Sequence, residues 1–445
     1  MKKVLIITYY WPPSGGSGVQ RWLKFAKYLP QFGWEPIIYT PKNPEANAVD
    51  SALAKDIAPN TTVLKTKIWE PYGFYKSLFA SVATAPRIKA NLISSNNTSF
   101  THRLSLFIRG NFFIPDPRCF WIKPSVKYLK KYLKDHPVDA IVSTGPPHSM
   151  HLIAKKVAET TGIKWIADFR DPWTEIFYFK HLKLSKYAYN KHIKLEQSVL
   201  DKANKVIVVS RKMQEDFAKR TLTPIEVITN GFDSDDFAIE TATTFTGDIN
   251  LAESCFTLTH TGIFVDNGNP CYLWEVLGEK AAVEPSFKEN LKIRLMGQVD
   301  DSILEGIETA GLWGNLINMG YVPHSTATMW QQKASVLLLP LRKEPEAAAI
   351  LTGKFFEYLA AGAPILAFGP VEGDLAKALQ ETASGKIVDF EDKDGVRKEI
   401  DLLYNNFLEE IKGNKKVAKN EISPSALKYS RKTLTSNLAK ALNNL

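Results

Sequence analysis

The segment richest in groups that could bind an anion spans residues 342–367, RKEPEAAAILTGKFFEYLAAGAPILA. An apolar run of strand length ends in a loop that carries Arg342 and Lys343, and Lys354 follows in the next helical stretch. Neutralising a leaving diphosphate without a fixed metal ion requires cations and helix N-termini. We therefore expect at least one of these three bases to bind a diphosphate.

The same segment contains a helix start that suits a phosphate group. Thr352 and Gly353 begin a short helix that ends at Gly362. The free amides of Leu351, Thr352 and Gly353 can bind a diphosphate there. Glu357 is a carboxylate on this otherwise apolar helix. Such a group either pairs with a base or accepts hydrogen bonds from a polyol such as ribose.

A second candidate is the glycine-rich loop of residues 10–18, YWPPSGGSG, which contains Gly15 and Gly16 and precedes a helical stretch. Glycines let a ligand approach the backbone, and a helix N-terminus favours an anion. The spacing differs from the dinucleotide-binding GxGxxG pattern, and the lysine of a P-loop is absent. The alternative is that the two glycines form only a tight turn between a strand and a helix.

Ionisable side chains follow two further strands of the first half. Residues 139–149, DAIVSTGPPHS, place His148 in a Gly-Pro-Pro loop, and residues 165–174, WIADFRDPWT, place Arg170 and Asp171 after an apolar run. Charges crowded at a strand end are costly unless they are paired or functional. We expect His148, Arg170 and Asp171 to be catalytic residues. The alternative for Arg170 is a buried ion pair with an aspartate that braces the loop.

The elements that must position these residues alternate between apolar strands and helical stretches. Continuous apolar runs indicate parallel strands that are covered on both faces. The expected strands are residues 4–8, 36–39, 62–65, 140–143, 164–167, 206–210, 225–229, 256–261, 291–296, 316–320, 335–340, 364–368 and 386–388. Two such series indicate two doubly wound α/β domains. Ligands bind at the carboxyl ends of such strands, so we expect the site in a cleft between the domains.

We expect a first domain over residues 1–235, a linker over 236–249 and a second domain over 250–424. The linker region is polar, acidic and rich in threonine, without periodicity. No run of about 18 apolar residues is present, and the short apolar run at the N-terminus lacks the features of a signal peptide. The 3 cysteines have no CxxC spacing, which favours a reducing cytoplasm as the location.

The net charge of +9 is unevenly distributed along the chain. Residues 1–236 hold 35 basic against 20 acidic residues, whereas residues 237–445 hold 21 against 27. Residues 118–134 and 179–194 interleave lysines with aromatic residues, which is typical of an interfacial helix on anionic lipid. The expected membrane face comprises Lys123, Lys127, Lys130, Lys131 and Lys134, with Trp121 and Tyr128 as anchors. The alternative is that the lysines simply surround core-facing helices. No nucleic-acid-binding module is recognised, so no nucleic-acid partner is expected.

Several motifs together resemble the retaining, nucleotide-sugar-dependent glycosyltransferases of family 4, which have the two-domain GT-B fold. They are GGSG at residues 15–18, VVS at 208–210, ITNGFD at 228–233, HTG at 260–262 and, most specifically, GKFFEYLAAGAPILA at 353–367. The segments GNFFIPDPRCFW, STGPPHSMHLIA and WIADFRDPWT are similar to a bacterial subgroup of that family. The resemblance covers nearly the whole chain.

The resemblance implies roles for single positions. Glu357 matches the second glutamate of the family's E-x7-E motif, which binds the donor ribose, and Gly15, Gly16 and Gly262 fall in donor-binding loops. The first glutamate of the motif is replaced by Ala349. This departure concerns donor-sugar recognition, for which Glu344 or Glu346 is a candidate substitute. Asp171 falls near a catalytic-site histidine of many relatives.

The family's Arg/Lys pair for the diphosphate is absent from residues 259–270, THTGIFVDNGNP. Arg342, Lys343 and Lys354 are the candidate replacements, with Arg21 as a further source of charge. The resemblance also implies that residues 425–445 form a helix that packs back towards the first domain. No metal or other cofactor is expected, because no His, Asp or Cys cluster has ligand spacing.

The expected reaction is transfer of a sugar, with retention, from a nucleoside-diphosphate sugar to a polysaccharide or lipid-linked acceptor in cell-surface glycan synthesis. The first domain would bind the acceptor, at or near the inner face of the membrane. Two alternatives remain open at this point. One is another GT-B enzyme such as a sugar-nucleotide epimerase, and the other is a catalytically silent nucleotide-sugar-binding subunit.

Overall fold

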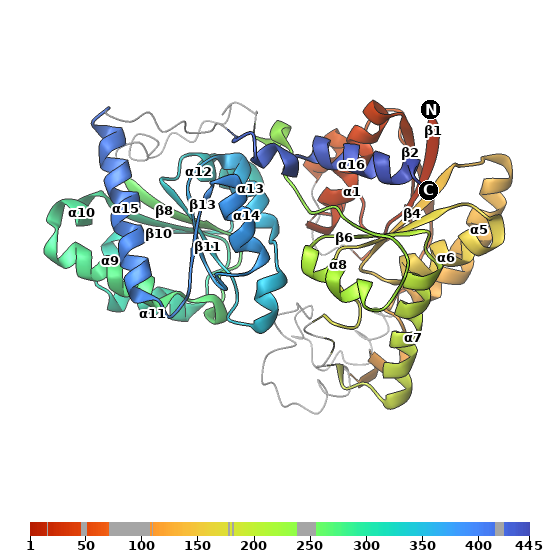
Figure 1. The fold of residues 1–445 in the computed structure, drawn as a ribbon, viewed down its shortest axis with the longest axis horizontal. Coiled ribbons are helices and arrows are strands. Elements are labelled where there is room, and N and C mark those ends of the chain that lie inside the picture. The colour runs from red at the N-terminus through yellow and green to blue at the C-terminus, as the bar shows by residue number, and fades with distance from the viewer. Residues whose placement is uncertain are drawn as a thin grey trace. The chain divides into compact units, whose positions relative to one another are not determined.

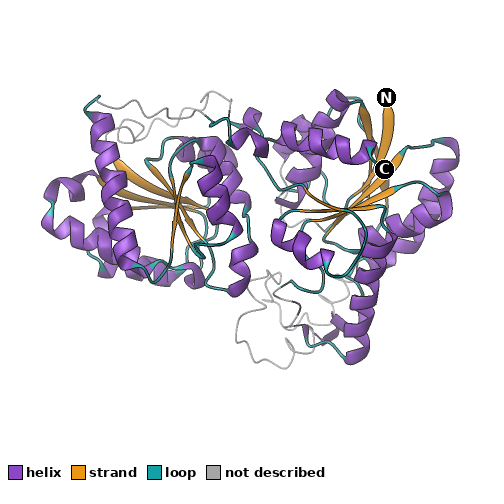
Figure 2. Cartoon of the chain, in the orientation of Figure 1, coloured by secondary structure: helices purple, strands orange, loops and turns teal. Residues whose placement is uncertain are grey.

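The computed structural model describes residues 1–15, 17–45, 51–70, 107–108, 110–176, 179, 182–237, 255–413 and 422–445. The chain forms two compact units (Figure 1). The first consists of Met1–Thr229 together with Leu434–Leu445, and the second of Asn230–Thr433. Each unit contains one parallel β-sheet with helices packed on both faces (Figure 2).

The first unit has a seven-stranded sheet in the order β3-β2-β1-β4-β5-β6-β7. Its strands are β1 Lys2–Ile7, β2 Trp34–Pro41, β3 Thr62–Thr66, β4 Ala140–Gly145, β5 Trp165–Phe169, β6 Lys205–Val208 and β7 Ile225–Val227. Its helices are α1 Ser17–Tyr28, α5 Ile122–Asp135, α6 Ser149–Thr161, α7 Lys186–Lys202 and α8 Arg211–Ala218, joined by α16 Arg431–Asn443 from the end of the chain. Short 3-10 turns are η1 Leu29–Phe32, η2 Ser51–Asp56 and η4 Cys119–Trp121. The strand order reverses between β1 and β4, which is where ligands bind in such sheets.

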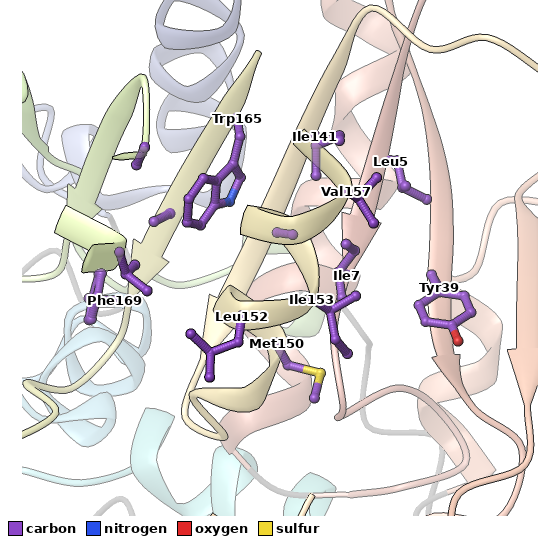
Figure 3. Close-up of a cluster of buried hydrophobic side chains, with 14 of the residues drawn as sticks. Leu5, Ile7, Tyr39, Ile141, Met150, Leu152, Ile153, Val157, Trp165 and Phe169 are labelled. Carbon is purple, nitrogen blue, oxygen red and sulfur yellow. The ribbon is translucent and has the colours of Figure 1, made fainter. Parts of the chain in front are cut away.

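Alternate residues of the central strands define the two faces of this sheet. Ile7 of β1 and Ile141 of β4 belong to the core that lies beneath α5, α6, α7 and α8. Ile153 and Val157 of α6 pack into this core (Figure 3). The opposite face packs against α1 and α16, where Leu438 of α16 is fully buried. The last helix is therefore part of the core of the first unit.

The second unit has a six-stranded sheet in the order β10-β9-β8-β11-β12-β13. Its strands are β8 Phe256–Thr261, β9 Leu291–Met296, β10 Leu316–Gly320, β11 Val336–Pro340, β12 Ile365–Phe368 and β13 Gly385–Val388. Its helices are α9 Cys271–Val283, α10 Pro285–Asn290, α11 Asp301–Thr309, α12 His324–Gln332, α13 Gly353–Ala361, α14 Asp374–Thr382 and α15 Lys393–Ile411. Its 3-10 turns are η6 Ser234–Asp236, η8 Asp266–Gly268, η9 Trp313–Asn315, η10 Pro345–Ala349 and η11 Ala426–Tyr429.

The helices of the second unit divide between the two faces of its sheet (Figure 1). Helices α9, α10, α11 and α15 pack on the face that carries Leu258 of β8 and Ile293 of β9. Helices α13 and α14 pack on the opposite face, against Leu337 and Leu339 of β11. Helix α12 covers part of that same face near β8 and β9. Helix α13 ends at Gly362, whose φ of 75° is readily adopted only by glycine.

The prediction of two parallel α/β sheets is confirmed, and every expected strand is present to within two residues at either end. Residues 230–235, which were expected in the first domain, belong to the second unit. Asp233 is buried, accepts a hydrogen bond from the amide of Asp235 and begins η6, so this part is folded into the second unit. The expected linker residues 238–249 lie outside the described residues. Among the helices that the structure describes, none is long and apolar enough to cross a membrane.

Candidate functional site

In the second unit, the carboxyl end of β8 meets the start of α13. β8 ends at Thr261, and Gly262 follows with a φ of +103°. The ammonium group of Lys354 lies against this turn, 3.4 Å from Nε2 of His260 and 3.2 Å from the carbonyl oxygen of Ile263. A Cβ atom on residue 262 would lie 2.5 Å from Cε of Lys354. The absence of a side chain at residue 262 therefore leaves space for the side chain of Lys354.

The charge states of this pair favour an anionic ligand. Burial lowers the pKa of Lys354 from 10.5 to about 8, although the nearby Glu357 opposes the shift. Burial, together with the Lys354 charge, holds the pKa of His260 well below 6.5. Nδ1 of His260 is 2.9 Å from the carbonyl of Leu338, which can only accept, so Nδ1 carries the proton. Nε2 then offers its lone pair to the ammonium group, which stays available as a partly desolvated cation.

Glu357 lies one turn after Lys354 on α13. Its side chain is 40 % exposed, and Oε1 is 4.0 Å from Nε2 of His324. Nε2 of Gln331 donates to Oε2 over a long 3.5 Å. Because both contacts are long, the carboxylate remains able to accept hydrogen bonds from a ligand hydroxyl.

A buried network fixes α12 and α13 to the end of β8. The hydroxyl oxygen of Tyr358 accepts from the amide of Thr261 at 3.0 Å, and Nε2 of Gln331 donates to Oγ1 of Thr261 at 2.9 Å. Burial raises the pKa of Tyr358 to about 12, so its hydroxyl stays protonated at neutral pH. The positions of Lys354 and Glu357 are thus set by buried hydrogen bonds on the adjoining residues.

The start of α13 is open at the place where a phosphate would approach. Oγ1 of Thr352 accepts from the amide of Phe355 at 3.3 Å and so caps the helix. Gly353 is exposed, and a Cβ atom there would meet no atom within 4 Å. Leu351 is half-buried just before the cap. The first-turn amides of a helix have no partner within it, so this end can bind an anion.

The other two candidate cations lie in the loop between β11 and η10. Arg342 is half-buried, and the following amide, that of Lys343, donates to the carbonyl of Asn267 at 2.7 Å. Nζ of Lys343 is 3.6 Å from Oε1 of Glu391 and 4.9 Å from the centre of the Phe390 ring. Lys343 thus contacts the segment after β13, whereas Lys354 is the candidate base that contacts Gly262.

In the first unit, Arg170 ties three loops together at the ends of β4 and β5. Nη1 donates to the carbonyl of Gly18 at 3.3 Å, and Nη2 donates to the carbonyl of Pro146. The guanidinium also lies 5.6 Å from the centre of the Tyr10 ring. The alternative interpretation of Arg170 as half of an ion pair is wrong, because its partners are backbone carbonyls. Its contacts are those of a positioning residue.

The buried ion pair of this region is formed by other residues. Asp168 accepts from Nη2 of Arg21 at 2.8 Å, from Nε1 of Trp22 at 2.7 Å and from Oγ1 of Thr144 at 2.8 Å. Burial would raise the pKa of Asp168, but Arg21 and these hydrogen bonds outweigh it and lower the pKa. Arg21 is 1 % exposed and also donates to the carbonyl of Thr229. The suggestion that Arg21 supplies charge to a diphosphate is therefore wrong, since its guanidinium is already bound to Asp168 and to the carbonyl of Thr229.

His148 lies in a cluster of buried rings at the start of α6. Its ring stacks on Trp173 with centroids 4.6 Å apart, and His151 stacks on Phe169 at 4.5 Å. Burial lowers the pKa of His148 well below 6.5 and that of His151 to about 3. A Cβ atom on Gly145 would lie 3.0 Å from Nδ1 of His148 and 2.5 Å from Nε2 of His151. Both imidazoles are neutral and closely packed around this glycine.

Asp171 is the first-unit candidate with the fewest contacts. Its side chain is half-buried, and it forms no hydrogen bond or ion pair with any residue that the structure describes. Burial raises the pKa of Asp171, and the Arg170 charge opposes this. Gly15 is half-buried before α1, and Gly16 lies outside the described residues. The structure therefore places Asp171, His148 and Arg170 on the loops that follow β4 and β5.

Three residues of the second-unit site were not predicted from the sequence: His260, Gln331 and Tyr358. His260 belongs to the HTG motif, so its position at the end of an expected strand was a usable signal. Tyr358 follows Glu357 directly, yet its contact with Thr261 depends on how α13 crosses the sheet. Gln331 lies on a separate helix and had no signal of its own. We refer below to His260, Gly262, Lys354 and Glu357 as the α13 site.

Comparisons with known proteins agree with this architecture. Residues 16–236 match the family profile described as Glycosyltransferase Family 4. No curated protein sequence matches the chain. Sucrose-phosphate synthase from Thermosynechococcus elongatus is 13 % identical with a TM-score of 0.61, covering 100 % of this chain and 99 % of that one. HepE from Anabaena, solved in complex with UDP, is 13 % identical with a TM-score of 0.60, covering 100 % of both chains.

A third similar structure is the N-terminal domain of Candida albicans trehalose-6-phosphate phosphatase. It is 11 % identical with a TM-score of 0.65, and the match covers 100 % of this chain and 97 % of that one. At such identities the likeness establishes the fold alone. The chain accordingly has the GT-B fold, and its residues 16–236 match the Glycosyltransferase Family 4 profile.

Proposed function

We propose that the protein is a glycosyltransferase that moves a sugar, with retention, from a nucleoside-diphosphate sugar to a saccharide or lipid-linked acceptor. The observation that carries the proposal is the α13 site. Lys354 and Glu357 stand one turn apart on a single helix, at the end of β8 and beside an open helix N-terminus. The cation and the amides suit a diphosphate, and the carboxylate suits the ribose that is joined to it.

Each group has a defined task in this proposal. Lys354 and the first amides of α13 stabilise the charge that grows on the diphosphate as the bond to the sugar breaks. Glu357 accepts the ribose hydroxyls and fixes the nucleotide along the helix. Glu344, whose Oε1 accepts from Asn267 at 3.0 Å in the loops after β8 and β11, is our candidate ligand for the donor sugar in place of Ala349. Arg342 is a further candidate for the diphosphate.

The first unit would bind the acceptor. Asp171 is the carboxylate that we propose to act near the reacting sugar, because it has no structural partner among the described residues and burial raises its pKa. Arg170 holds the Asp171 loop against the carbonyls of Gly18 and Pro146. His148 shapes the same loop through its stack on Trp173 and stays neutral at physiological pH.

The decisive experiment is a donor screen followed by turnover. Thermal unfolding of the full chain in the presence of individual nucleotide sugars should show stabilisation by one class of donor, because a ligand of the folded state stabilises it by mass action. With that donor and membrane or saccharide extracts as acceptor, we expect release of the nucleoside diphosphate. Retention of configuration in the product, read by NMR, would separate the proposed reaction from an inverting one.

The alanine at position 349, where the family motif has a glutamate, favours one alternative, a nucleotide-sugar-binding subunit without catalytic activity. That alternative predicts that the donor stabilises the protein against unfolding but that no acceptor leads to release of nucleoside diphosphate. An epimerase would instead convert the donor into a second nucleotide sugar without an acceptor. The same donor screen distinguishes the three outcomes.

We also propose that the first unit contacts an anionic membrane surface through α5 and α6. Lys123, Lys127 and Lys130 of α5 and Lys156 of α6 line a groove of about 360 Å³, together with Val126. All four lysines are exposed and form no ion pair with a described residue. Such a grouping of unpaired cations suits phosphate headgroups.

The expected aromatic anchors of this face need revision. Trp121 is 1 % exposed, stacks on Tyr39 with ring centroids 4.9 Å apart and donates to Oγ1 of Thr66 at 2.9 Å. The prediction that Trp121 is a membrane anchor is therefore wrong, since this ring is part of the core. Tyr128 is 38 % exposed but also stacks on Tyr39, at 5.8 Å. Any attraction to the bilayer at α5 then depends on charge.

We expect the full chain to co-sediment with anionic but not with neutral vesicles, and to be released by high salt because screening shortens the reach of charge. A lysine near an anionic surface contributes roughly 1 kcal/mol. Lys127→Gln should therefore weaken vesicle binding about fivefold, whereas Lys202→Gln, at the end of α7 and outside the groove, should not. Equal sedimentation with both vesicle types, or with neither, would contradict the membrane proposal.

A further inference from the structure

A buried arginine in the second unit has no acidic partner among the described residues. Arg294 of β9 is 4 % exposed, and its guanidinium lies 3.8 Å from the centre of the Trp330 ring on α12. Nε and Nη1 are sealed from solvent and bond to no acceptor. Burial lowers the pKa of Arg294 to about 10, which still leaves the group charged at neutral pH. A cation–π contact offsets only part of the cost of burying such a charge.

Two neighbouring groups are unsatisfied in the same way. Thr259 of β8 is the register partner of Arg294, so the two side chains stand on the same face of the sheet. Oγ1 of Thr259 is buried without a hydrogen-bond partner, and so is Nε1 of Trp330. The guanidinium, the indole N–H and the hydroxyl are thus three hydrogen-bond donors gathered without an acceptor.

The charge around Arg294 is positive and not balanced. Lys292, two residues earlier on the same face of β9, is half-buried and also forms no ion pair with a described residue. Ile317, the register partner of Arg294 on the edge strand β10, is 37 % exposed. With Nε and Nη1 sealed, Nη2 is the guanidinium nitrogen through which Arg294 can meet a ligand. An oxyanion at Nη2 accepts a charge-assisted hydrogen bond from the guanidinium.

We propose that Arg294, Trp330 and Thr259 form a binding site for a small oxyanion, a phosphate or carboxylate group. The site lies on the face of the second sheet that α12 covers, and none of its residues belongs to the α13 site. The anion supplies an acceptor to the guanidinium and lies next to the other two unsatisfied donors. It also balances the buried positive charge. The proposal does not depend on the glycosyltransferase activity, because it concerns a ligand of the folded chain.

The test compares thermal unfolding of the full chain in sodium phosphate with unfolding in sodium chloride at equal ionic strength. We expect a saturable rise in Tm that is specific to phosphate. Arg294→Met should raise the phosphate concentration at half-effect at least tenfold, while its flexible apolar stem still packs on Trp330. Sodium acetate at the same ionic strength separates the two chemistries: a rise with both salts assigns a general oxyanion site, and a rise with phosphate alone assigns a phosphate site.

Two control variants locate the bound phosphate. Phosphate can also bind at the α13 site, so the test concerns only the part of the response that Arg294→Met removes. That part should persist in Lys354→Met, and its loss in that variant would mean that phosphate binds at the α13 site and would overturn the proposal. In sodium chloride, Arg294→Met should unfold at a temperature no lower than the wild type, because it removes an unpaired buried charge. A lower Tm, with an unchanged phosphate response, would mark Arg294 as purely structural. If Arg294→Met does not fold, Trp330→Phe provides the test, since it keeps the ring and removes one donor.

Discussion

Replacing Lys354 by methionine is expected to lower turnover about 100-fold or more, the scale of losing one group that stabilises charge in the transition state. Lys354 is placed for this role by Gly262, which leaves room for the lysine stem, and by the carbonyl of Ile263, which accepts from its ammonium group. Methionine retains the length and apolar packing of the stem. The loss should therefore appear in turnover and leave the fold intact.

The pH profile gives an independent measure of the same residue. Because burial lowers the pKa of Lys354 to about 8, the free enzyme holds the cation below this pH and loses it above. We expect kcat/KM to fall as pH rises through about 8, by roughly tenfold for each further unit, as the group deprotonates. This fall in kcat/KM above about pH 8 should be absent in Lys354→Met.

Lys343→Met is the matched control for this variant. The side chain of Lys343 lies near Glu391 and Phe390, on the loop after β13. Its loss should change turnover only slightly. Near-normal turnover in Lys354→Met, measured as release of nucleoside diphosphate, would show that the charge is stabilised from elsewhere and would leave Arg342 as the remaining candidate base.

The strands could be predicted because buried parallel strands are apolar along their whole length. Ala140–Gly145 is buried at every residue, and so is Phe256–Thr261. This signal is local in the sequence and does not depend on which strands are neighbours. It therefore identified both sheets of the GT-B fold.

The partners of charged side chains could not be predicted in the same way. The sequence places Arg170 next to Asp171 and two residues from Asp168, which suggested a local ion pair. In the structure Asp168 pairs with Arg21, which is 147 positions away, because α1 packs across the end of β5. β5 ends at Phe169, so Arg170 and Asp171 lie on the following loop, where Arg170 donates to backbone carbonyls.

The face that an amphipathic segment turns towards the core was also not predictable from the sequence. The lysines and Tyr128 lie on α5, Trp121 ends the preceding turn η4, and the membrane hypothesis placed all of them on one face. Trp121 instead directs its ring at Tyr39 of β2, where stacking and a hydrogen bond to Thr66 bury it. The lysines remain exposed on α5. Which side of a helix faces the core is set by the strand it packs on.

Glu357→Ala is expected to weaken binding of the preferred nucleoside diphosphate by about 2–3 kcal/mol, which is on the order of 30- to 150-fold. The contacts of the carboxylate with described residues are long, at 4.0 Å to His324 and 3.5 Å to Gln331, so it can accept both ribose hydroxyls. Losing it leaves these hydroxyls without an acceptor. Glu305→Ala, an exposed glutamate on α11 of the same unit, is the control and should bind normally.

A cycle with deoxynucleotides separates direct contact from a general disturbance of α13. If Glu357 accepts the ribose hydroxyls, removing one hydroxyl from the nucleotide should weaken binding to the wild type but have little further effect in Glu357→Ala, because the two changes remove the same interaction. Isothermal titration calorimetry measures all four affinities. Additive losses would mean that Glu357 acts through Gln331 and Thr261, with which it shares the buried network, and not on the ribose. Unchanged affinity in the folded variant would remove Glu357 from the site altogether, because no other contact would then join this carboxylate to the donor.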